Sequence, residues 1–133
     1  MAEDPVVKEY LSKEMVEAGE GLVRELDRQN WPVEDALWLY NEDRNRWQLV
    51  IASPKVESDG SLRSYEVIRD SLQRVPQAAD AMSYFDVTVR SPSDRLIEAI
   101  GRERNTGPGI HRRRFRGAVG GQYVDDALLY RST

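Results

Sequence analysis

The spacing of apolar residues changes from a helical period to a strand period along this chain, and that change limits the folds it can adopt. Apolar residues recur at steps of three and four over residues 5–29, and at every second position in several later segments. The first spacing lines one stripe of a helix, whereas the second lines one face of a strand. Since each kind of element must bury its apolar side against another, the sequence predicts an α+β fold with a shared core.

The length of 133 residues is typical of one domain, and residues 1–133 are predicted to form a single α+β domain. The expected order is α-β-β-α-β-α-β-β, and two hairpins favour a mainly antiparallel five-stranded sheet covered by one layer of three helices. The helices are expected over residues 5–29, about 62–75 and from Ser91 through Ile100, and the strands over Val33–Tyr40, Arg46–Ser53, Tyr84–Arg90, Ile110–Val119 and Gln122–Arg131.

Several local details follow from these assignments. Asp4 and Pro5 form a cap and first-turn pair for the first helix. The strand over residues 33–40 is apolar on both faces, so we place it in the middle of the sheet. Trp38 and Trp47 are expected to face each other across the first hairpin, and Phe85 is expected to point inward.

Residue counts exclude several chemistries. The chain has no cysteine, which removes disulfides, thiolate zinc sites and cysteine nucleophiles. His111 is the single histidine, so a histidine zinc site is excluded by number, and we assign no catalytic residue and no cofactor. The start lacks the features of a secretory signal, and no apolar run approaches the length of a membrane span, so we expect a cytoplasmic protein with no membrane contact.

The charges are unevenly distributed along the chain, which has a net charge of −4. Residues 1–60 hold 7 basic and 14 acidic side chains, whereas residues 100–133 hold 7 basic and 3 acidic ones. We expect the acidic front and the basic end to pair within the fold. The alternatives are that the acidic front masks a basic partner, as an immunity-type protein does, or that the basic end binds anions.

Four arginines within five residues form the main basic feature. In a regular strand, Arg112, Arg114 and Arg116 share one face and repeat every ~6.6–6.8 Å, close to the phosphate spacing of a nucleic acid. They are therefore the candidate anion-binding residues, while Phe115 lies on the opposite face and is assigned to the core. The alternatives are that the arginines pair with glutamates of the first helix, that they form a charged sheet edge which prevents aggregation, or that they are simply solvated.

Two acid pairs stand at the starts of two predicted strands. Glu34 and Asp35 begin one strand and Asp125 and Asp126 begin another, and four converging carboxylates would suit Mg²⁺ or Mn²⁺. The pairs meet only if the two strands are parallel neighbours, because antiparallel neighbours would place them at opposite ends. The alternative is that these acids are solvated or paired with arginines.

Several segments together resemble a family of small hypothetical bacterial proteins with no established activity. They are the stretches PVEDALWLY, WQLVIASP, VRSPSD, NTGPGI and YVDDALLYR, within about residues 12–131. The resemblance implies a complete stand-alone bacterial protein and assigns no functional residue. We interpret the chain as a non-enzymatic interaction domain that contacts another protein through its surface. The alternatives are a nucleic-acid or phosphate-ester binder, with or without a metal at the acid pairs, and an acidic immunity-type protein.

Overall fold

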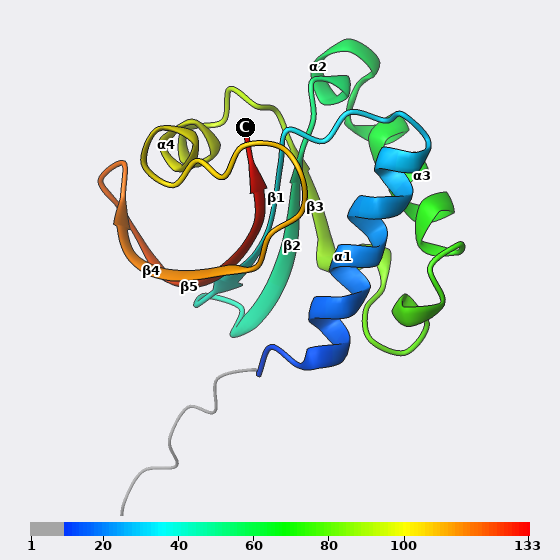
Figure 1. Cartoon of the computed structure of the whole chain (residues 1–133), viewed down its shortest axis with the longest axis horizontal. Coiled ribbons are helices and arrows are strands. Elements are labelled where there is room, and N and C mark those ends of the chain that lie inside the picture. The colour runs from blue at the N-terminus through cyan, green and yellow to red at the C-terminus, as the bar shows by residue number, and fades with distance from the viewer. Residues whose placement is uncertain (1–9) are drawn as a thin grey trace, which may run out of the picture.

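The computed structural model describes residues 10–133, which form a five-stranded sheet with helices on both faces (Figure 1). The α+β class is as predicted. The helices are α1 (Lys13–Arg28), α2 (Lys55–Asp59), α3 (Ser61–Leu72) and α4 (Arg95–Glu103), the 3₁₀ turns are η1 (Pro76–Ala78) and η2 (Tyr84–Asp86), and the strands are β1 (Asp35–Asn41), β2 (Arg46–Ala52), β3 (Val87–Arg90), β4 (Arg113–Val119) and β5 (Gln122–Ser132).

The sheet order is β3-β2-β1-β5-β4, so β1 is the central strand, as its two apolar faces predict. The β1–β2, β1–β5 and β4–β5 pairings are antiparallel, and both expected hairpins are present. The β2–β3 pairing is parallel, which makes the sheet mixed. A parallel pairing needs a long crossover, and α2 and α3 supply it.

Helices cover both faces of the sheet, so the prediction of a single helical layer is wrong. Trp38 and Leu49 belong to a core shared with α1 and α3, whereas Leu37 and Val50 pack with residues of α4 on the opposite face. Figure 1 shows α1 and α3 on one side and α4 on the other, inside the curl of β4 and β5. Because β1 and β2 are apolar on both faces, leaving either face in water would forfeit much of the hydrophobic stabilisation.

The first helix is shorter than its apolar stripe predicts. Ser12 is the N-cap, and its hydroxyl accepts a hydrogen bond from the Met15 amide at 3.1 Å. The helix therefore begins at Lys13 rather than near residue 5, and the predicted Asp4–Pro5 cap lies outside the described residues. The end of the helix is as expected, since Asn30 adopts a φ of 60° and turns the chain away.

The aromatic pairing in the first hairpin differs from the prediction. Trp47 lies opposite Tyr40, with ring centroids 5.4 Å apart in an edge-on arrangement, while Trp38 lies opposite Leu49. The two tryptophans do share one face of the sheet. The turn over residues 42–45 sets a register in which they are diagonal neighbours rather than partners, because turn length determines which residues face each other.

The third strand begins three residues later than predicted, at Val87. Asp86 accepts a hydrogen bond from the Ser83 amide at 2.8 Å and closes a 3₁₀ turn over the expected strand start. Phe85 is consequently 72% exposed, and the prediction that it faces inward is wrong. Its ring stacks on Tyr84 with centroids 4.3 Å apart.

The remaining boundaries shift by a few residues. The segment 55–59, predicted as a loop, is the short helix α2. Asp94 caps α4 by accepting from the amides of Leu96 and Ile97 at 3.1 and 3.2 Å, so this helix begins after the expected Ser91–Pro92 start. The β4–β5 hairpin turns at Gly120 and Gly121, whose φ angles of 58° and 80° fit a type I′ turn.

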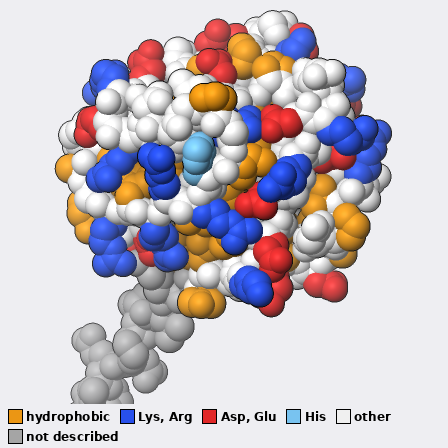
Figure 2. Space-filling view, viewed as in Figure 1, with side chains coloured by type: hydrophobic (Ala, Val, Ile, Leu, Met, Phe, Trp, Pro, Cys, Tyr) orange, Lys and Arg blue, Asp and Glu red, His pale blue; other side chains and the backbone are white. Residues whose placement is uncertain are grey.

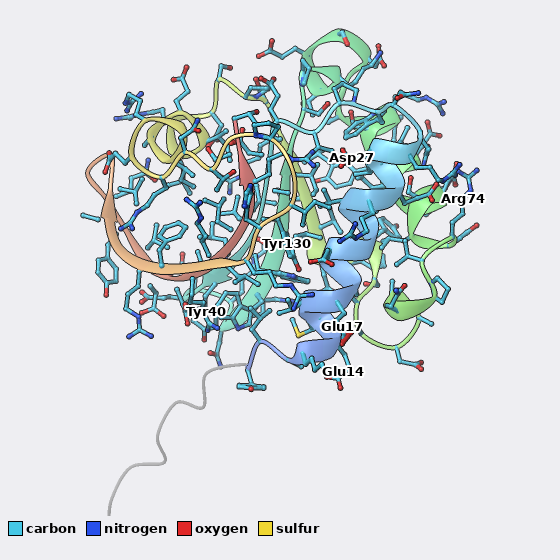
Figure 3. All side chains as sticks on the ribbon, in the orientation of Figure 1. Glu14, Glu17, Asp27, Tyr40, Arg74 and Tyr130 are labelled. Carbon is cyan, nitrogen blue, oxygen red and sulfur yellow. The ribbon has the colours of Figure 1, made fainter. Side chains whose placement is uncertain are left out.

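Helix α1 approaches the sheet most closely at Gly19. The Trp38 indole donates to the Tyr130 hydroxyl at 3.0 Å, and the Tyr130 hydroxyl donates to the carbonyl of Val16 on α1. Figure 3 shows Tyr130 between the sheet and this helix. A Cβ on Gly19 would lie 2.6 Å from the Tyr130 oxygen and 2.7 Å from the indole nitrogen, so only glycine lets the helix reach this pair.

Replacing Gly19 with alanine is expected to lower the free energy of unfolding by about 1–3 kcal/mol, because overpacking outweighs the better helix propensity of alanine. Gly101 in α4 is the matched control, since a Cβ there would meet its nearest neighbour, Ser132 Oγ, at an ordinary 3.8 Å. Gly101→Ala should stabilise by about 1 kcal/mol or less. Urea denaturation of both variants checks this, and equal effects of the two substitutions would contradict the packing argument.

Candidate anion-binding site

The three arginines singled out by the sequence lie on the face of β4 turned away from α4, and each is near a carboxylate. Arg112 Nε lies 3.0 Å from Glu20 of α1. Arg114 binds Asp126 through two hydrogen bonds of 2.7 Å, and Arg116 lies 4.0 Å from the same carboxylate. The predicted stripe therefore exists, but its charge is largely compensated within the fold.

Arg114 is the most firmly held of the three. Its guanidinium lies 5.3 Å from the centre of the Trp47 ring, in addition to its bidentate contact with Asp126. The hydrogen bonds that Arg114 donates to the buried carboxylate of Asp126 raise the pKa of Arg114 above its usual value. These contacts hold Arg114 against the sheet, although its side chain is 54% exposed and also lines the hollow between the end of α4 and β4.

Pairing between the acidic front and the basic end of the chain is confirmed. Arg112 reaches Glu20, and Arg131 binds Asp27 with an Nη2–Oδ2 distance of 2.7 Å. Glu25 of the same helix contacts Arg28 and Arg74, and its hydrogen bond with Arg28 is the main cause that lowers its pKa to about 2. Much of the acidic charge of α1 is thus occupied by arginines of its own chain, which leaves less of it for masking a basic partner.

The structure does not bring the two acid pairs together. β1 and β5 are antiparallel neighbours, so Asp35 lies opposite Ser132, while Asp125 and Asp126 lie beyond the other end of that pairing, where Leu39 faces Ala127. Within residues 10–133, no group of three or more histidine, cysteine or acidic side chains could hold a metal ion. A metal site shared by the four carboxylates is therefore not formed.

The four acids occupy distinct surroundings. Asp126 binds Arg114, and Asp125 lines a separate hollow near Leu39 at the end of the first hairpin. The backbone carbonyl of Glu34 accepts from the amide of residue 133 at 3.1 Å, at the opposite end of the sheet. Each pair thus belongs to the local structure of its own strand.

Asp35 is the unusual member of this set, because it is only 3% exposed. Its Oδ1 and the Oγ of the facing Ser132 are buried and have no hydrogen-bond partner among the described residues. Burial, followed by the neighbouring charge of Glu34, raises the pKa of Asp35 to about 6, against 3.8 for the free side chain. The fold therefore favours the protonated form of this carboxyl.

Five exposed arginines among residues 10–133 have no carboxylate within ion-pair distance, namely Arg44, Arg95, Arg102, Arg104 and Arg113. Two of them, Arg104 and Arg113, which the sequence did not single out, line one hollow. Arg104 caps the C-terminal end of α4, and its guanidinium lies 5.0 Å from the centre of the Phe115 ring. Arg113 is the first residue of β4, opposite Leu129. Among residues 10–133, no carboxylate lies within the 4.0 Å ion-pair distance of either guanidinium, although both side chains are exposed.

Arg104 and Arg113 line the same hollow, which encloses about 510 Å³ between the end of α4 and β4. Phe115 and Leu129, both buried, contribute apolar surface, and Asn105 contributes an amide. Glu103 also lines the hollow, but its Oε2 accepts a hydrogen bond from the Gly120 amide at 2.9 Å. Figure 2 shows basic side chains gathered over the region of α4 and β4 around the single histidine.

Alternate side chains of β4 point to opposite faces of the sheet, and this pattern predicts the position of one residue of the site. Arg113 shares a strand face with Phe115, and that face turns toward α4. The partner, Arg104, follows the buried stripe of α4 by a few residues. Their meeting depends on how far β4 and β5 curl around the helix, and a strand pattern carries no information on such curvature.

Comparisons of this chain with protein-family models, with curated proteins and with solved structures found no match. None of the helices formed by residues 10–133 has the length and apolar character required to cross a bilayer.

Replacing Asp35 with asparagine is expected to change how stability depends on pH. Because the folded-state pKa of about 6 exceeds the unfolded value of 3.8, the contribution of the protonated carboxyl is complete below pH 3.8 and is lost as the pH rises through 6. The free energy of unfolding of Asp35→Asn, relative to that of the wild type, should therefore increase from pH 4 to pH 8, by no more than about 3 kcal/mol.

Urea unfolding of both proteins at pH 4, 6 and 8 measures this difference, and the other titrating groups cancel in the comparison. Asp43→Asn is the matched control, since Asp43 is an exposed aspartate in the turn between β1 and β2. A difference between Asp35→Asn and wild type that stays constant with pH would show that folding does not shift the pKa of Asp35.

Proposed function

We propose that this chain is a binding protein that recognises an anionic group, carboxylate or phosphate, of a partner at the hollow between α4 and β4. The observation that supports this is the contrast among the arginines. Arg112, Arg114 and Arg116 have carboxylates nearby. Arg104, Arg113 and Arg114 line one cavity, and the first two have no carboxylate within ion-pair distance among the described residues.

The chemistry of the hollow suits an anion. A guanidinium offers several donors in a planar fork, which matches the oxygens of a carboxylate or phosphate in pairs. Phe115 and Leu129 exclude water from one side, and a lower local dielectric strengthens the attraction between charges. The volume of about 510 Å³ falls in the range of small-molecule sites.

The end of α4 works against an anion, but only weakly. A helix C-terminus carries about half a negative charge, and the Glu103 carboxylate adds one more to the lining, but the three guanidinium groups of Arg104, Arg113 and Arg114 exceed both together. Arg104 also offsets this charge as the C-cap residue, and the amide of Arg104 donates to the Ile100 carbonyl at 2.7 Å. The balance at the hollow is therefore positive.

A protein or a small anion is favoured over a nucleic acid as the partner. The whole chain carries a net charge of −4, and dedicated nucleic-acid binders usually present a strongly basic surface. The arginine stripe with phosphate-like spacing is compensated by Glu20 and Asp126. Binding is also favoured over catalysis, since the lining supplies mainly cations, an amide and apolar surface. The single histidine, His111, does not line the hollow, and its Nε2 lies 3.1 Å from the carbonyl oxygen of Pro108.

Isothermal titration of the protein with citrate and with pyrophosphate tests the proposal. Arg104→Ala and Arg113→Ala should each weaken binding about tenfold or more, because a hydrogen bond to a charged group contributes about 1.5–3 kcal/mol. The matched controls are Arg102→Ala in α4 and Arg112→Ala just before β4, since neither residue lines the hollow. Both controls should bind within about twofold of the wild type.

Two results would contradict the proposal. One is a loss of affinity in the controls as large as in the variants of the hollow, which would mean that diffuse surface charge binds the anion. The other is the absence of heat with either anion at millimolar concentration and low salt, where binding to guanidinium groups is strongest.

A further inference from the structure

The strand beside the hollow, β4, lies at an edge of the sheet. It pairs with β5 on one side, and no strand within residues 10–133 pairs with its other side. An edge strand presents a row of N–H and C=O groups that another extended chain can use. The hollow and this open edge are adjacent, because Arg113 and Phe115 belong to both.

The opposite edge of the sheet differs. There the amide of Val89 on β3 donates to the hydroxyl of Tyr65 at 3.2 Å, so a side chain of α3 blocks part of that edge. Such blocking is a common protection against unwanted strand pairing. The hydrogen bonds among the described residues do not cover the backbone of β4 with a side chain in this way, so the two edges are not equivalent.

Within the β4–β5 pairing, an acidic residue of β5 compensates the charge of arginines on β4. Asp126 on β5 binds Arg114 through two hydrogen bonds of 2.7 Å and also approaches Arg116. This carboxylate compensates the face of β4 turned away from α4. On the other face, Glu103 lines the hollow but accepts a hydrogen bond from the Gly120 amide, and no carboxylate among residues 10–133 lies within ion-pair distance of Arg113 or the nearby Arg104.

The usable length of the edge is short. The pairing between β4 and β5 shifts register between Phe115 and Gly117, and Gly117 has a φ of 117°, which interrupts the regular strand. The regular part is therefore Arg113–Arg116, about 13 Å at ~3.3 Å per residue. A strand segment of four to six residues would match it.

We propose that the partner is an acidic extended segment of another protein, which adds to the free edge of β4 and places its carboxylates in the hollow at Arg104 and Arg113. This inference rests on the proposed anion-binding function and names its partner. Backbone hydrogen bonds to β4 give the segment its direction, and alternate acidic residues give it specificity. A second copy of this chain is a poor occupant, since two β4 strands would bring like-charged arginines opposite each other.

The probe is a fluorescein-labelled, acetylated seven-residue peptide of alternating threonine and glutamate, titrated against the full chain and followed by fluorescence anisotropy. Two further peptides carry N-methyl groups at all odd or at all even positions, which removes the amide donors on one side of an extended strand. Strand addition requires that one methylated peptide binds at least tenfold more weakly than the parent, while the other stays within about threefold. A slip of the peptide by two residues leaves this parity unchanged.

Arg113→Ala should weaken the parent peptide at least tenfold, and Arg112→Ala should leave it within about twofold. Equal binding of all three peptides would overturn strand addition while leaving the anion site intact. Binding of pyrophosphate without binding of the parent peptide would do the same. If neither pyrophosphate nor the parent peptide binds, the proposed anion-binding function is contradicted as well. Tighter binding of a ten-nucleotide oligothymidylate than of the peptide would overturn the acidic segment as the partner.

Discussion

The path of β5 determines the arrangement of the rest of the structure. This strand pairs with both β1 and β4, and its register shifts once in each pairing. In the first pairing Tyr130 is the extra residue, and in the second Asp125 and Asp126 together face Arg116. A bulge bends its strand and redirects side chains, so these two irregularities let β5 lie under α1 at one end and curl around α4 at the other.

The bulge at Tyr130 makes two consecutive side chains available to the α1 side. Tyr130 bonds to the Val16 carbonyl, and Arg131 follows it with Nη contacts of 3.0 and 2.7 Å to Asp27. Arg131 also donates to the carbonyls of Gly109 at 2.7 Å and Val33 at 3.1 Å. A guanidinium that is only 7% exposed must have its donors satisfied, because an unpaired buried charge is costly. This side chain therefore ties α1, the start of β1 and the segment before β4 together, and it fixes the approach of β4 to α4.

Prediction from sequence was most accurate for features that depend on the residues of a single element or turn. The hairpins, the end of α1 and the core position of Phe115 follow from local patterns and turn chemistry. Prediction was less accurate where tertiary contacts decide, as at Phe85, where a 3₁₀ turn closed by Ser83 and Asp86 replaces an alternating strand. The two helical layers were implied by the apolar faces of the central strand, which predict cover on both sides as well as a central position. The candidate hollow and the predicted arginine stripe lie on opposite faces of β4, because a stripe of arginines shows where charge lies and not whether carboxylates meet it.

Compensation, rather than the number of arginines, is the ground on which we propose a binding surface at the hollow. The acidic front of the chain supplies Glu20 and Asp27 to the arginines of the basic end, and β5 supplies Asp126, so most of the conspicuous cations serve the fold. Arg104 and Arg113 line a hollow over apolar surface and receive no such carboxylate among the described residues. Glu103, the acidic residue of the lining, accepts a hydrogen bond from the Gly120 amide at 2.9 Å instead of pairing with either arginine. An exposed pair of this kind beside an open strand edge therefore suits a negative charge that comes from another molecule.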